Sequence, residues 1–463
     1  MKRLPEYTPL IPEILARIRA AVGPDAVTVD SAALDDASRD ASTERHVPDA
    51  VVQATTSAEV AALLTLANTL HFPVTPRGAG TGLAAGALPV HGGVVLSLAR
   101  MNRILNIDAA NLTAEVEPGV IVAELRAAAR AQGLFYPPDP ASLDTATIGG
   151  TAATNAGGPA CVKYGVTKHY VLGLEAVLPS GEIISAGTAT RKGVVGYDLA
   201  QLLIGSEGTL GVITKLILKL VPHPEATRTQ VALFGSLTEA MRAVAAVMAA
   251  GVTPSAIEFL DSRCLHLVGD LLPVGNLPPD GALLLMETDG AAAAAEAELA
   301  RASTVCQEQG ATHLLPAKDE DERERLWNVR RQVSLRIHDS APVYVSEDVV
   351  LPLSRIAEFV AALPPLETRH GVTIYAFGHS GDGNIHVNIT APETIGPALE
   401  TCITELLTLV IEMGGTISGE HGIGSAKKRF LPLELSPASM RLQRALKLTF
   451  DPGLILNPGK IFA

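Results

Sequence analysis

A glycine-rich loop that directly follows an expected strand constrains the fold of this chain most. It consists of Pro76, Arg77, Gly78, Ala79, Gly80, Thr81 and Gly82. Glycines at alternate positions let backbone N–H groups converge on phosphate oxygens without Cβ clashes. A Rossmann loop would read G-x-G-x-x-G and continue as a helix, whereas Leu83 occupies the sixth position here, and Gly86 and Pro89 follow. The context argues against a Rossmann NAD site, and taken alone the loop is equally compatible with a simple turn.

Two further glycine-dense segments follow before residue 215. The second contains Thr147, Gly149, Gly150, Thr154, Asn155, Gly157 and Gly158. The third contains Glu207, Gly208 and Ile213. Small residues allow a ligand to approach the backbone closely, and the threonine hydroxyls can donate hydrogen bonds. Three such segments together predict a long diphosphate cofactor that lies against a sheet.

Helix and strand signals alternate through this first half of the chain. Thr56 and Glu59 form a capping-box pattern that opens a helix with apolar residues on one face. A second helix is expected over 120–132, and strands are expected over 51–54, 72–76, 93–98, 112–116, 171–178 and 211–220. We expect residues 139–165 to form one long functional loop, because loops of that length are rarely mere connectors.

The pattern changes at residues 221–225. Strands are then expected over 229–234, 254–260 and 282–288, with helices over 237–250 and 291–309. This arrangement predicts an α+β domain on an antiparallel sheet, followed by a mostly helical tail after about residue 395. We expect four parts: an N-terminal helical segment (1–47), a cofactor-binding domain (48–224), a substrate or cap domain with a metal site (225–395), and a C-terminal helical segment that completes both sites (396–463).

Composition and charge narrow the class of protein. The chain has 36 basic and 49 acidic residues, a net charge of −13, which argues against a nucleic-acid binder. Its four cysteines are far apart and favour reduced thiols in a cytoplasmic chain. No apolar run is long enough for a transmembrane segment, and the N-terminus is expected to form a short amphipathic helix rather than a signal peptide. Any attachment to the inner membrane would go through a partner.

A second chemical signal lies at residues 378–388. His379 and His386 would face opposite sides of one regular strand, but the intervening Ser-Gly-Asp-Gly-Asn predicts a hairpin turn that brings both imidazoles together. Asn388 then shares a face with His386. Glu420 adds a carboxylate beside His421. Two histidines and one carboxylate with open positions are typical of a catalytic metal site, although two such histidines alone are more often surface residues of a hairpin.

The three glycine segments, with Lys163-Tyr164-Gly165 and Gly196-Tyr197-Asp198-Leu199, resemble the FAD domain of the vanillyl-alcohol oxidase/PCMH superfamily over residues 48–224. The resemblance implies FAD held between two α+β subdomains, a ferredoxin-like antiparallel-sheet cap domain, and FAD contacts from the three segments and from Asn457. Some relatives attach FAD covalently through a His or Cys of the first loop. Residues 82–86 contain neither, so noncovalent FAD is expected.

The C-terminal half resembles the FAD-linked D-lactate, glycolate and D-2-hydroxyglutarate dehydrogenases. The resemblance implies a divalent metal, zinc foremost and manganese as the alternative, bound by His379, His386 and Glu420. It makes His421 the catalytic base and Asn388 a substrate contact. Arg330, in the family's W-x-x-R pattern, would hold the substrate carboxylate as a bidentate fork, and Ser334 lies one helical turn further. On the residues alone, Arg330 could instead belong to a solvated basic helix face with Arg323, Arg325, Arg331 and Arg336.

The expected function is metal-assisted oxidation of a small D-2-hydroxy acid, D-lactate foremost, to the 2-oxo acid. Hydride would pass to flavin N5, and electrons onward to a cytochrome, an electron-transfer protein or a quinone. The hydroxyglutarate branch has a Lys after the Val-Tyr of a strand, whereas Val345 and Ser346 follow Val343-Tyr344 here, which favours a monocarboxylate. The alternatives are the FAD subunit of a glycolate oxidase complex, a D-2-hydroxyglutarate dehydrogenase, a metal-free FAD oxidase, or an inactive scaffold subunit. The assembly is expected to be a homodimer or a hetero-oligomeric oxidase complex.

Overall fold

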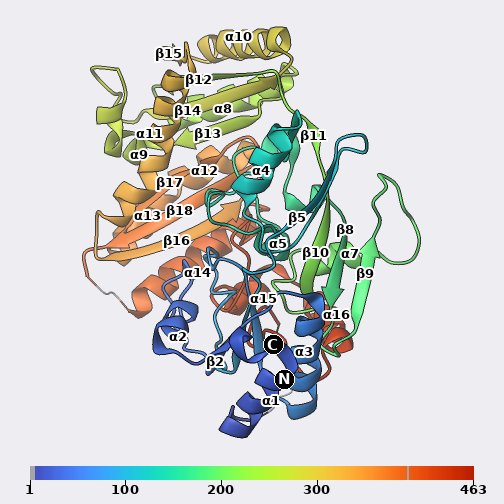
Figure 1. Ribbon diagram of the computed structural model, residues 1–463. Coiled ribbons are helices and arrows are strands. Elements are labelled where there is room, and N and C mark those ends of the chain that lie inside the picture. The colour runs from blue at the N-terminus through green and yellow to red at the C-terminus, as the bar shows by residue number, and fades with distance from the viewer. Residues whose placement is uncertain (1–5, 394–395, 463) are drawn as a thin grey trace. The chain divides into compact units, whose positions relative to one another are not determined.

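The computed structural model describes residues 6–393 and 396–462 and divides into two compact units. The first unit combines three separate stretches of chain, up to residue 157, 166–222, and from 420 onward. The second unit consists of 158–165 and 223–419. Figure 1 labels their helices and strands. The expected N-terminal helix is α1 (Pro12–Val22), with Ile14, Ile18 and Val22 buried, and residues 1–5 lie outside the described part.

The first unit begins with a four-stranded sheet of order β1-β2-β4-β3, formed by β1 (Val27–Thr28), β2 (Ala50–Gln53), β4 (Val94–Ser97) and β3 (Val74–Arg77). Both β2 and β3 are parallel to β4. Helix α3 (Ser57–Leu70) joins β2 to β3 and packs against α1. The Thr56 hydroxyl accepts the Glu59 N–H at 3.2 Å, and the Glu59 carboxylate accepts the Thr55 N–H at 2.7 Å. The predicted start of this helix is thereby confirmed.

A second, antiparallel sheet of the first unit has the order β5-β6-β10-β8-β9. Its strands are β5 (Ile104–Asp108), β6 (Thr113–Val116), β10 (Val212–Lys219), β8 (Val171–Val177) and β9 (Ile183–Gly187). Val177 and Val212 of this sheet share one buried core with the apolar face of α3. Helix α3 is therefore packed between the two sheets. The short strands β7 (Leu134–Phe135) and β11 (Val221–Pro222) form a separate pair.

The expectation of one continuous loop over 139–165 is wrong. This stretch contains α5 (Ile148–Thr154) in the first unit and α6 (Cys161–Tyr164) in the second. The Thr147 hydroxyl caps α5 by accepting the Gly150 N–H at 3.2 Å, and Asn155 ends it in the left-handed conformation (φ 52°). Glycine and threonine are poor helix formers, so this helix depends on its cap and on tertiary packing more than on intrinsic propensity.

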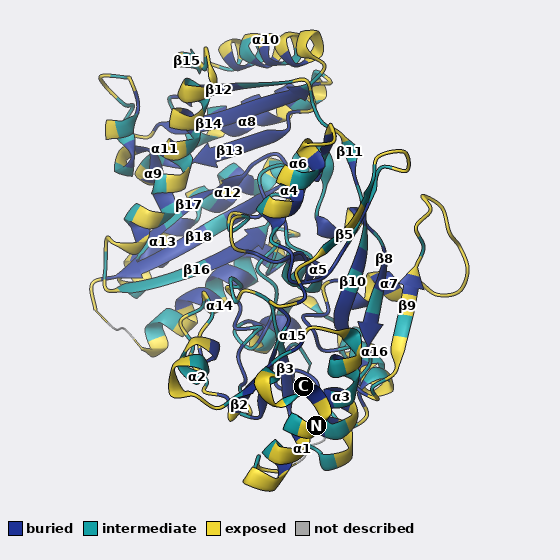
Figure 2. Cartoon of the chain, viewed as in Figure 1, coloured by how far each residue is buried: buried dark blue, intermediate teal, exposed yellow. Residues whose placement is uncertain are grey.

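The C-terminal stretch of the first unit contains α15 (Leu431–Glu434) and α16 (Pro437–Phe450) and then returns to the first sheet, where Leu456 forms a parallel bridge with Val74. The remaining helices and 3-10 turns of this unit are α2 (Ser31–Ala37), α4 (Val122–Arg130), α7 (Leu199–Leu203), Pro24–Ala26, Thr167–His169 and Lys428–Phe430. The chain between β9 and α7 is drawn almost wholly as exposed in Figure 2.

The second unit is built on a seven-stranded antiparallel sheet of order β15-β12-β14-β13-β17-β18-β16. The first four positions are β15 (His313–Pro316), β12 (Ala226–Phe234), β14 (Ala282–Gly290) and β13 (Ala256–Leu260). With α8 (Leu237–Ala249) and α10 (Ala292–Glu308), they form two β-α-β repeats in ferredoxin-like order, as expected. The sheet continues with β17 (Thr373–His379), β18 (Asn384–Ala391) and β16 (Val343–Val350).

Helices cover both faces of this sheet. Alternate residues of β12 and β14, among them Leu233 and Leu285, form one core with α9 (Ser262–Leu267) and α11 (Glu320–His338). The intervening residues face α10, as the contact between Met286 and Cys306 shows. The strands between these layers are mostly buried in Figure 2. The remaining helices and turns are α12 (Ile356–Ala361), α13 (Leu363–His370), α14 (Pro397–Glu412), Gly269–Leu271 and Leu353–Arg355.

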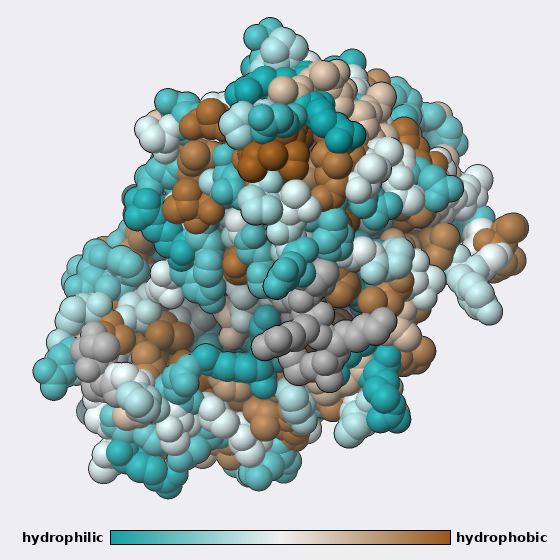
Figure 3. All heavy atoms as spheres, turned by 90° about the horizontal axis from the view of Figure 1, so that it is seen from below, coloured by the Kyte–Doolittle hydropathy of each residue, from teal (hydrophilic) through white to brown (hydrophobic). Residues whose placement is uncertain are grey.

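None of the helices within residues 6–393 and 396–462 combines the length and the apolar composition that crossing a membrane requires. On the face shown in Figure 3, apolar side chains form separate brown patches among hydrophilic ones.

Candidate functional site

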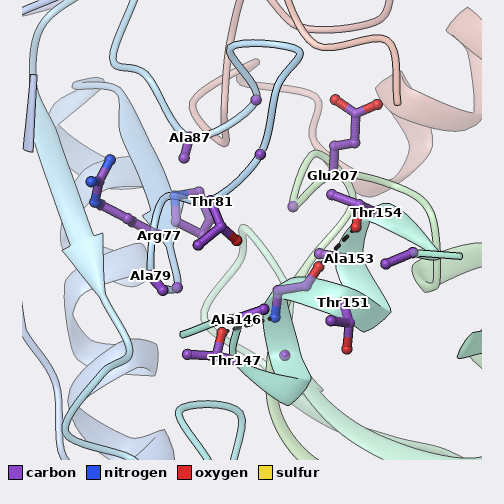
Figure 4. A pocket seen from close by; sticks show the side chains of 18 of the residues that line it. Arg77, Ala79, Thr81, Ala87, Ala146, Thr147, Thr151, Ala153, Thr154 and Glu207 are labelled. Atoms are coloured by element: carbon purple, nitrogen blue, oxygen red, sulfur yellow. Dashed lines mark hydrogen bonds between the residues drawn. The ribbon is translucent and has the colours of Figure 1, made fainter. Parts of the chain in front are cut away.

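A pocket in the first unit is formed by the three glycine-dense segments (Figure 4). Of the expected cofactor-binding residues, the pocket is lined by Pro76, Arg77, Gly78, Ala79, Gly80, Thr81, Gly82, Thr147, Gly149, Gly150, Thr154, Gly157, Glu207, Gly208 and Ile213. Among the other lining residues are Pro118, Pro140, Ala146, Ala153, Glu420 and His421. Ala146 and Ala153 are neighbours of expected residues, and Pro140 lies in the stretch 139–165 that was expected to be functional. No sequence signal marks Pro118.

Asn155, Gly158 and Asn457 do not line this pocket. Asn155 ends α5, and its Oδ1 accepts the Lys168 N–H at 2.9 Å. Gly158 belongs to the second unit. Asn457 is fully buried, and its Nδ2 donates to the carbonyl oxygens of Gly86 at 2.9 Å and Glu207 at 2.7 Å. Asn457 therefore holds two lining loops in place from behind.

The backbone of the first segment fits a diphosphate. Within the described residues, none of the N–H groups from Gly78 to Gly82 donates to a protein acceptor. A Cβ on Gly78 would lie 2.4 Å from Thr147 Oγ1, and one on Gly149 would lie 2.4 Å from Pro118 Cβ. The segment thus combines unpaired backbone donors with close packing at Gly78, which is the arrangement that backbone anion sites use. The residues present therefore fit a dinucleotide cofactor.

Glu207 links this pocket to the C-terminal stretch. It adopts a left-handed conformation (φ 51°), and its carboxylate accepts the N–H groups of Ile423 and Gly424, each at 2.7 Å. Figure 4 shows its side chain pointing away from Thr154. Burial raises the pKa of Glu207, and the two backbone hydrogen bonds oppose this effect. These bonds fix the turn that carries His421 at the pocket wall.

In the second unit, the hairpin expected around residue 381 is confirmed. His379 ends β17, His386 lies on β18, and their ring centroids are 5.1 Å apart. The turn requires glycine at Gly378 (φ 152°) and Gly383 (φ 88°), because a Cβ on either would meet a backbone oxygen at 2.4 Å or less. The hairpin therefore brings together the two imidazoles that lie seven residues apart in the chain.

Glu420 directly follows Gly419, the last residue of the second unit. His379 and His386 of the second unit offer two of the three expected ligands, and Glu420 of the first unit stays the proposed third. The Asp348 carboxylate accepts the Gly419 N–H at 2.6 Å and so anchors the chain just before Glu420. Two imidazole nitrogens and one carboxylate suit zinc or another first-row divalent metal. The donor set therefore fits the expected ion.

Glu258, a buried acid that the sequence interpretation missed, forms a hydrogen bond with His379. Glu258 on β13 is fully buried, and its carboxylate bonds His379 Nδ1 at 2.5 Å and accepts from Arg330 Nε at 2.6 Å. Burial raises the pKa of Glu258, but the positive charges of His379 and Arg330 outweigh it and bring the pKa to about 2. Because Nδ1 faces Glu258, Nε2 is the nitrogen that His379 offers to a metal. A single acid within the apolar stretch 256–260 was the available signal.

Arg330 does not lie on a solvated helix face. Its side chain is 12% exposed, whereas that of the next residue, Arg331, is 50% exposed. The guanidinium lies over the Phe377 ring, 4.5 Å from the centroid. Within the described residues, its two terminal nitrogens have no hydrogen-bond partner. Arg330 therefore presents an unused fork that suits a carboxylate.

Asn388 lies on the same sheet face as His386, two residues further along β18. It is fully buried, and its Oδ1 accepts the Tyr344 hydroxyl at 2.7 Å. Its Nδ2 has no partner within the described residues, and an unpaired buried donor is costly unless a ligand satisfies it. Ser334 is half-buried on α11, one turn after Arg330. The sequence interpretation used Tyr344 to align this strand with the family and did not predict its contact with Asn388.

Comparison with known proteins agrees with both units. Residues 48–187 match the FAD binding domain family, and residues 223–461 match the C-terminal domain of FAD linked oxidases. The chain is 40% identical over 422 residues to the glycolate oxidase subunit GlcD of Bacillus subtilis, covering 90% of each chain. It is 36% identical over 469 residues to the D-lactate dehydrogenase of Anaerostipes hadrus, covering 98% of each. The solved structure of p-cresol methylhydroxylase superposes with a TM-score of 0.79 at 18% identity, covering 97% of this chain and 96% of that one.

The fold and the glycine-lined pocket define a flavoprotein with the PCMH-type FAD-binding fold, as the sequence predicted. More narrowly, the chain belongs to the family of FAD-linked oxidases, and it is an FAD-linked oxidoreductase.

Proposed function

We propose that the chain oxidises a small D-2-hydroxy acid, D-lactate foremost, to the 2-oxo acid, using noncovalent FAD and a divalent metal. The observation that carries the proposal is the unused fork of Arg330, a residue of α11 that contacts the sheet bearing the His379/His386 pair. A carboxylate anchor and a metal donor set are what a 2-hydroxy acid requires for its two oxygen functions. The relatives named D-lactate dehydrogenase and glycolate oxidase subunit support this substrate class.

Each residue takes a role that follows from its chemistry. A bound divalent cation would lower the pKa of a coordinated hydroxyl, and a bound flavin would accept the hydride. His379, His386 and Glu420 would hold the cation, zinc foremost or manganese. Arg330 would bind the substrate carboxylate through its two terminal nitrogens, and Ser334 lies one turn away on the same helix. Asn388 would donate Nδ2–H to a substrate oxygen. His421 would take the hydroxyl proton at Nδ1 or Nε2.

The sheet face that carries His386 and Asn388 favours a substrate with a single carboxylate. Along β16, Tyr344, Ser346 and Asp348 share the face of Asn388 and His386, and Ser346 stands directly opposite Asn388. These three residues offer no cation for a second carboxylate. D-Lactate or glycolate therefore suits the face better than D-2-hydroxyglutarate.

The remaining proposals concern FAD attachment and electron transfer. Residues 76–87 contain no His or Cys that could form a covalent bond to the flavin, which supports noncovalent FAD. We also propose that electrons leave to a cytochrome, an electron-transfer protein or a quinone. The similarity to a glycolate oxidase subunit favours a second candidate, the FAD subunit of a hetero-oligomeric oxidase complex.

The test is an anaerobic titration of the purified chain, followed by the visible flavin absorption. D-Lactate, L-lactate, glycolate and D-2-hydroxyglutarate are added separately, before and after dialysis against a chelator. We expect D-lactate to bleach the flavin band, chelation to abolish bleaching, and Zn²⁺ or Mn²⁺ to restore it. A yellow protein that none of the four acids bleaches would contradict the proposed substrate class. Bleaching that persists after the metal has been removed would contradict the metal's role.

A further inference from the structure

We propose that Glu258 is a positioning residue that sets the orientation of His379 and, through the same carboxylate, the place of the Arg330 guanidinium. The inference rests on the proposed function, because it assigns His379 to the metal and Arg330 to the substrate carboxylate. Glu258 would touch neither the metal nor the substrate, but the contacts of His379 and Arg330 with them would depend on it.

The sheet register places Glu258 next to His379. Glu258 on β13 stands directly opposite His379 on the antiparallel strand β17, so both side chains project from the same face. One carboxylate oxygen, Oε1, bonds His379 Nδ1 at 2.5 Å. Metal-binding histidines commonly donate their second ring nitrogen to a carboxylate, which fixes the ring and raises its basicity as a ligand. Glu258 is placed to do this for His379.

The second carboxylate oxygen serves Arg330. Oε2 accepts Nε–H at 2.6 Å, while the guanidinium lies on the Phe377 ring. Phe377 is two residues before His379 on β17 and therefore shares its face. The guanidinium is thus held at Nε by Glu258 and on one flat side by Phe377. Only the two terminal nitrogens remain for a ligand, and they form the edge that binds a carboxylate bidentately.

An amide cannot replace this carboxylate. Both partners of Glu258 donate hydrogen bonds, and each takes a different oxygen. Glutamine has one acceptor oxygen and two N–H donors, so it can satisfy His379 or Arg330 but would face the other donor with its own NH₂ group. Glu258→Gln should therefore disturb one contact or both while barely changing the volume of the side chain.

The same sheet offers a matched control. Glu287 on β14 is 8% exposed, and it accepts hydrogen bonds from Trp327 at 2.8 Å and from Arg323 at 2.8 Å, both on α11. It also accepts the Thr229 hydroxyl at 2.7 Å. Glu287 thus joins the same helix to the same sheet through an arginine, and none of its hydrogen-bond partners within residues 6–393 and 396–462 is a histidine. Glu287→Gln should cost similar packing and stability without reaching the metal site.

The experiment compares the full-length wild type, Glu258→Gln, Glu258→Asp and Glu287→Gln, each freed of metal. Zn²⁺ binding is measured by calorimetric titration, and the ligand field is followed by the visible absorption of added Co²⁺. We expect Glu258→Gln to raise the Kd for Zn²⁺ by about 10- to 100-fold and to alter the Co²⁺ spectrum. Glu258→Asp should recover part of the affinity, and Glu287→Gln should bind both ions as the wild type does. In steady-state assays, KM for the hydroxy acid should rise in Glu258→Gln but not in Glu287→Gln.

The outcomes separate this inference from the proposed function. Wild-type Zn²⁺ affinity in Glu258→Gln, or an equal loss in Glu287→Gln, would overturn the positioning role while leaving the hydroxy-acid activity intact. A wild-type chain that binds neither ion would overturn the metal site and this inference together. If Glu258→Gln does not fold, the Glu258→Asp variant decides: unchanged Zn²⁺ affinity and an unchanged Co²⁺ spectrum there would overturn the proposal.

Discussion

The hydroxyl of Tyr344 donates a hydrogen bond to Oδ1 of Asn388 across 2.7 Å, and this bond decides which end of the amide is left for a ligand. Because Oδ1 is occupied, the buried Nδ2 is the group that Asn388 presents as a donor. Without Tyr344, the amide could turn over and offer its oxygen to an anionic substrate. Tyr344 therefore orients Asn388 so that a hydrogen-bond donor faces the proposed anionic substrate.

Tyr344→Phe should raise KM for D-lactate about fivefold, with a smaller change in kcat. The estimate corresponds to one hydrogen bond worth about 1 kcal/mol. Asn388→Asp should raise KM by more than this, because it replaces the donor with a second negative charge. Steady-state kinetics on both variants test the relationship. Equal KM values for Tyr344→Phe and the wild type would show that the amide is oriented by other contacts.

Gly78→Ala should weaken FAD binding about tenfold or more. Its Cβ would lie 2.4 Å from Thr147 Oγ1, and that hydroxyl caps α5, so its displacement costs about 1–2 kcal/mol. Gly82→Ala is the control in the same loop, because a Cβ there meets no atom within 4 Å. The measurement is the flavin content of each purified variant and its FAD dissociation constant. Similar losses in both variants would contradict the close packing of Gly78.

Arg330→Lys should raise KM for the hydroxy acid at least tenfold, because an ammonium cannot form the two parallel hydrogen bonds of the guanidinium fork. Arg331→Lys is the matched control, since Arg331 is 50% exposed and pairs with Glu324. Kinetics with D-lactate distinguish the two positions. If KM rose as much or more in Arg331→Lys as in Arg330→Lys, Arg330 would not be the residue that binds the substrate carboxylate.

The stability of the first unit should depend on pH through Lys460. This lysine is buried and donates to the Leu88 carbonyl oxygen, and burial lowers its pKa from 10.5 to about 8. Below pH 8 the ammonium is charged in both the folded and the unfolded state, so burying the charge lowers the free energy of unfolding by its full amount. Between pH 8 and 10.5 the folded protein loses the proton first, and the cost disappears.

The free energy of unfolding of the wild type, measured relative to Lys460→Met, should therefore rise by about 3 kcal/mol from pH 8 to 10.5. Denaturant unfolding of both proteins at the two pH values measures this difference. A difference that stays constant across the range, or that falls, would show that Lys460 keeps an ordinary pKa in the folded protein.

Local signals in the sequence sufficed for most of the fold. The Thr56–Glu59 cap, the alternating strands of the first unit and the hairpin at His379 follow from spacing that the structure reproduces. Helix α5 escaped prediction because its Gly, Thr and Ala residues have no amphipathic pattern, and its start depends on a single Thr147 cap. Short strands such as β9 escaped because they owe their conformation to pairing with β8 rather than to their own residues.

The residues of the candidate site also fall into those that the sequence predicted and those that it did not. His379, His386 and Arg330 could be proposed from the sequence because they stand in motifs that resemble a known family, although each residue taken alone had a surface interpretation. Glu258 and Tyr344 act by pairing with residues 121 and 44 positions away. Such partners are set by strand register, and one sequence without its fold does not specify register between distant strands.

The return of the C-terminal stretch to the first sheet governs the order in which the chain can mature. Val74 pairs with Leu456, Asn457 braces the loops at Gly86 and Glu207, and Lys447 donates to the Thr209 carbonyl oxygen at 2.7 Å. None of these contacts can form until the ribosome has translated more than 440 codons. The entire second unit is synthesised before them and can fold while it waits. The glycine segments of the flavin pocket are therefore synthesised before most of the second unit, and the C-terminal residues that hold them in place are synthesised after it.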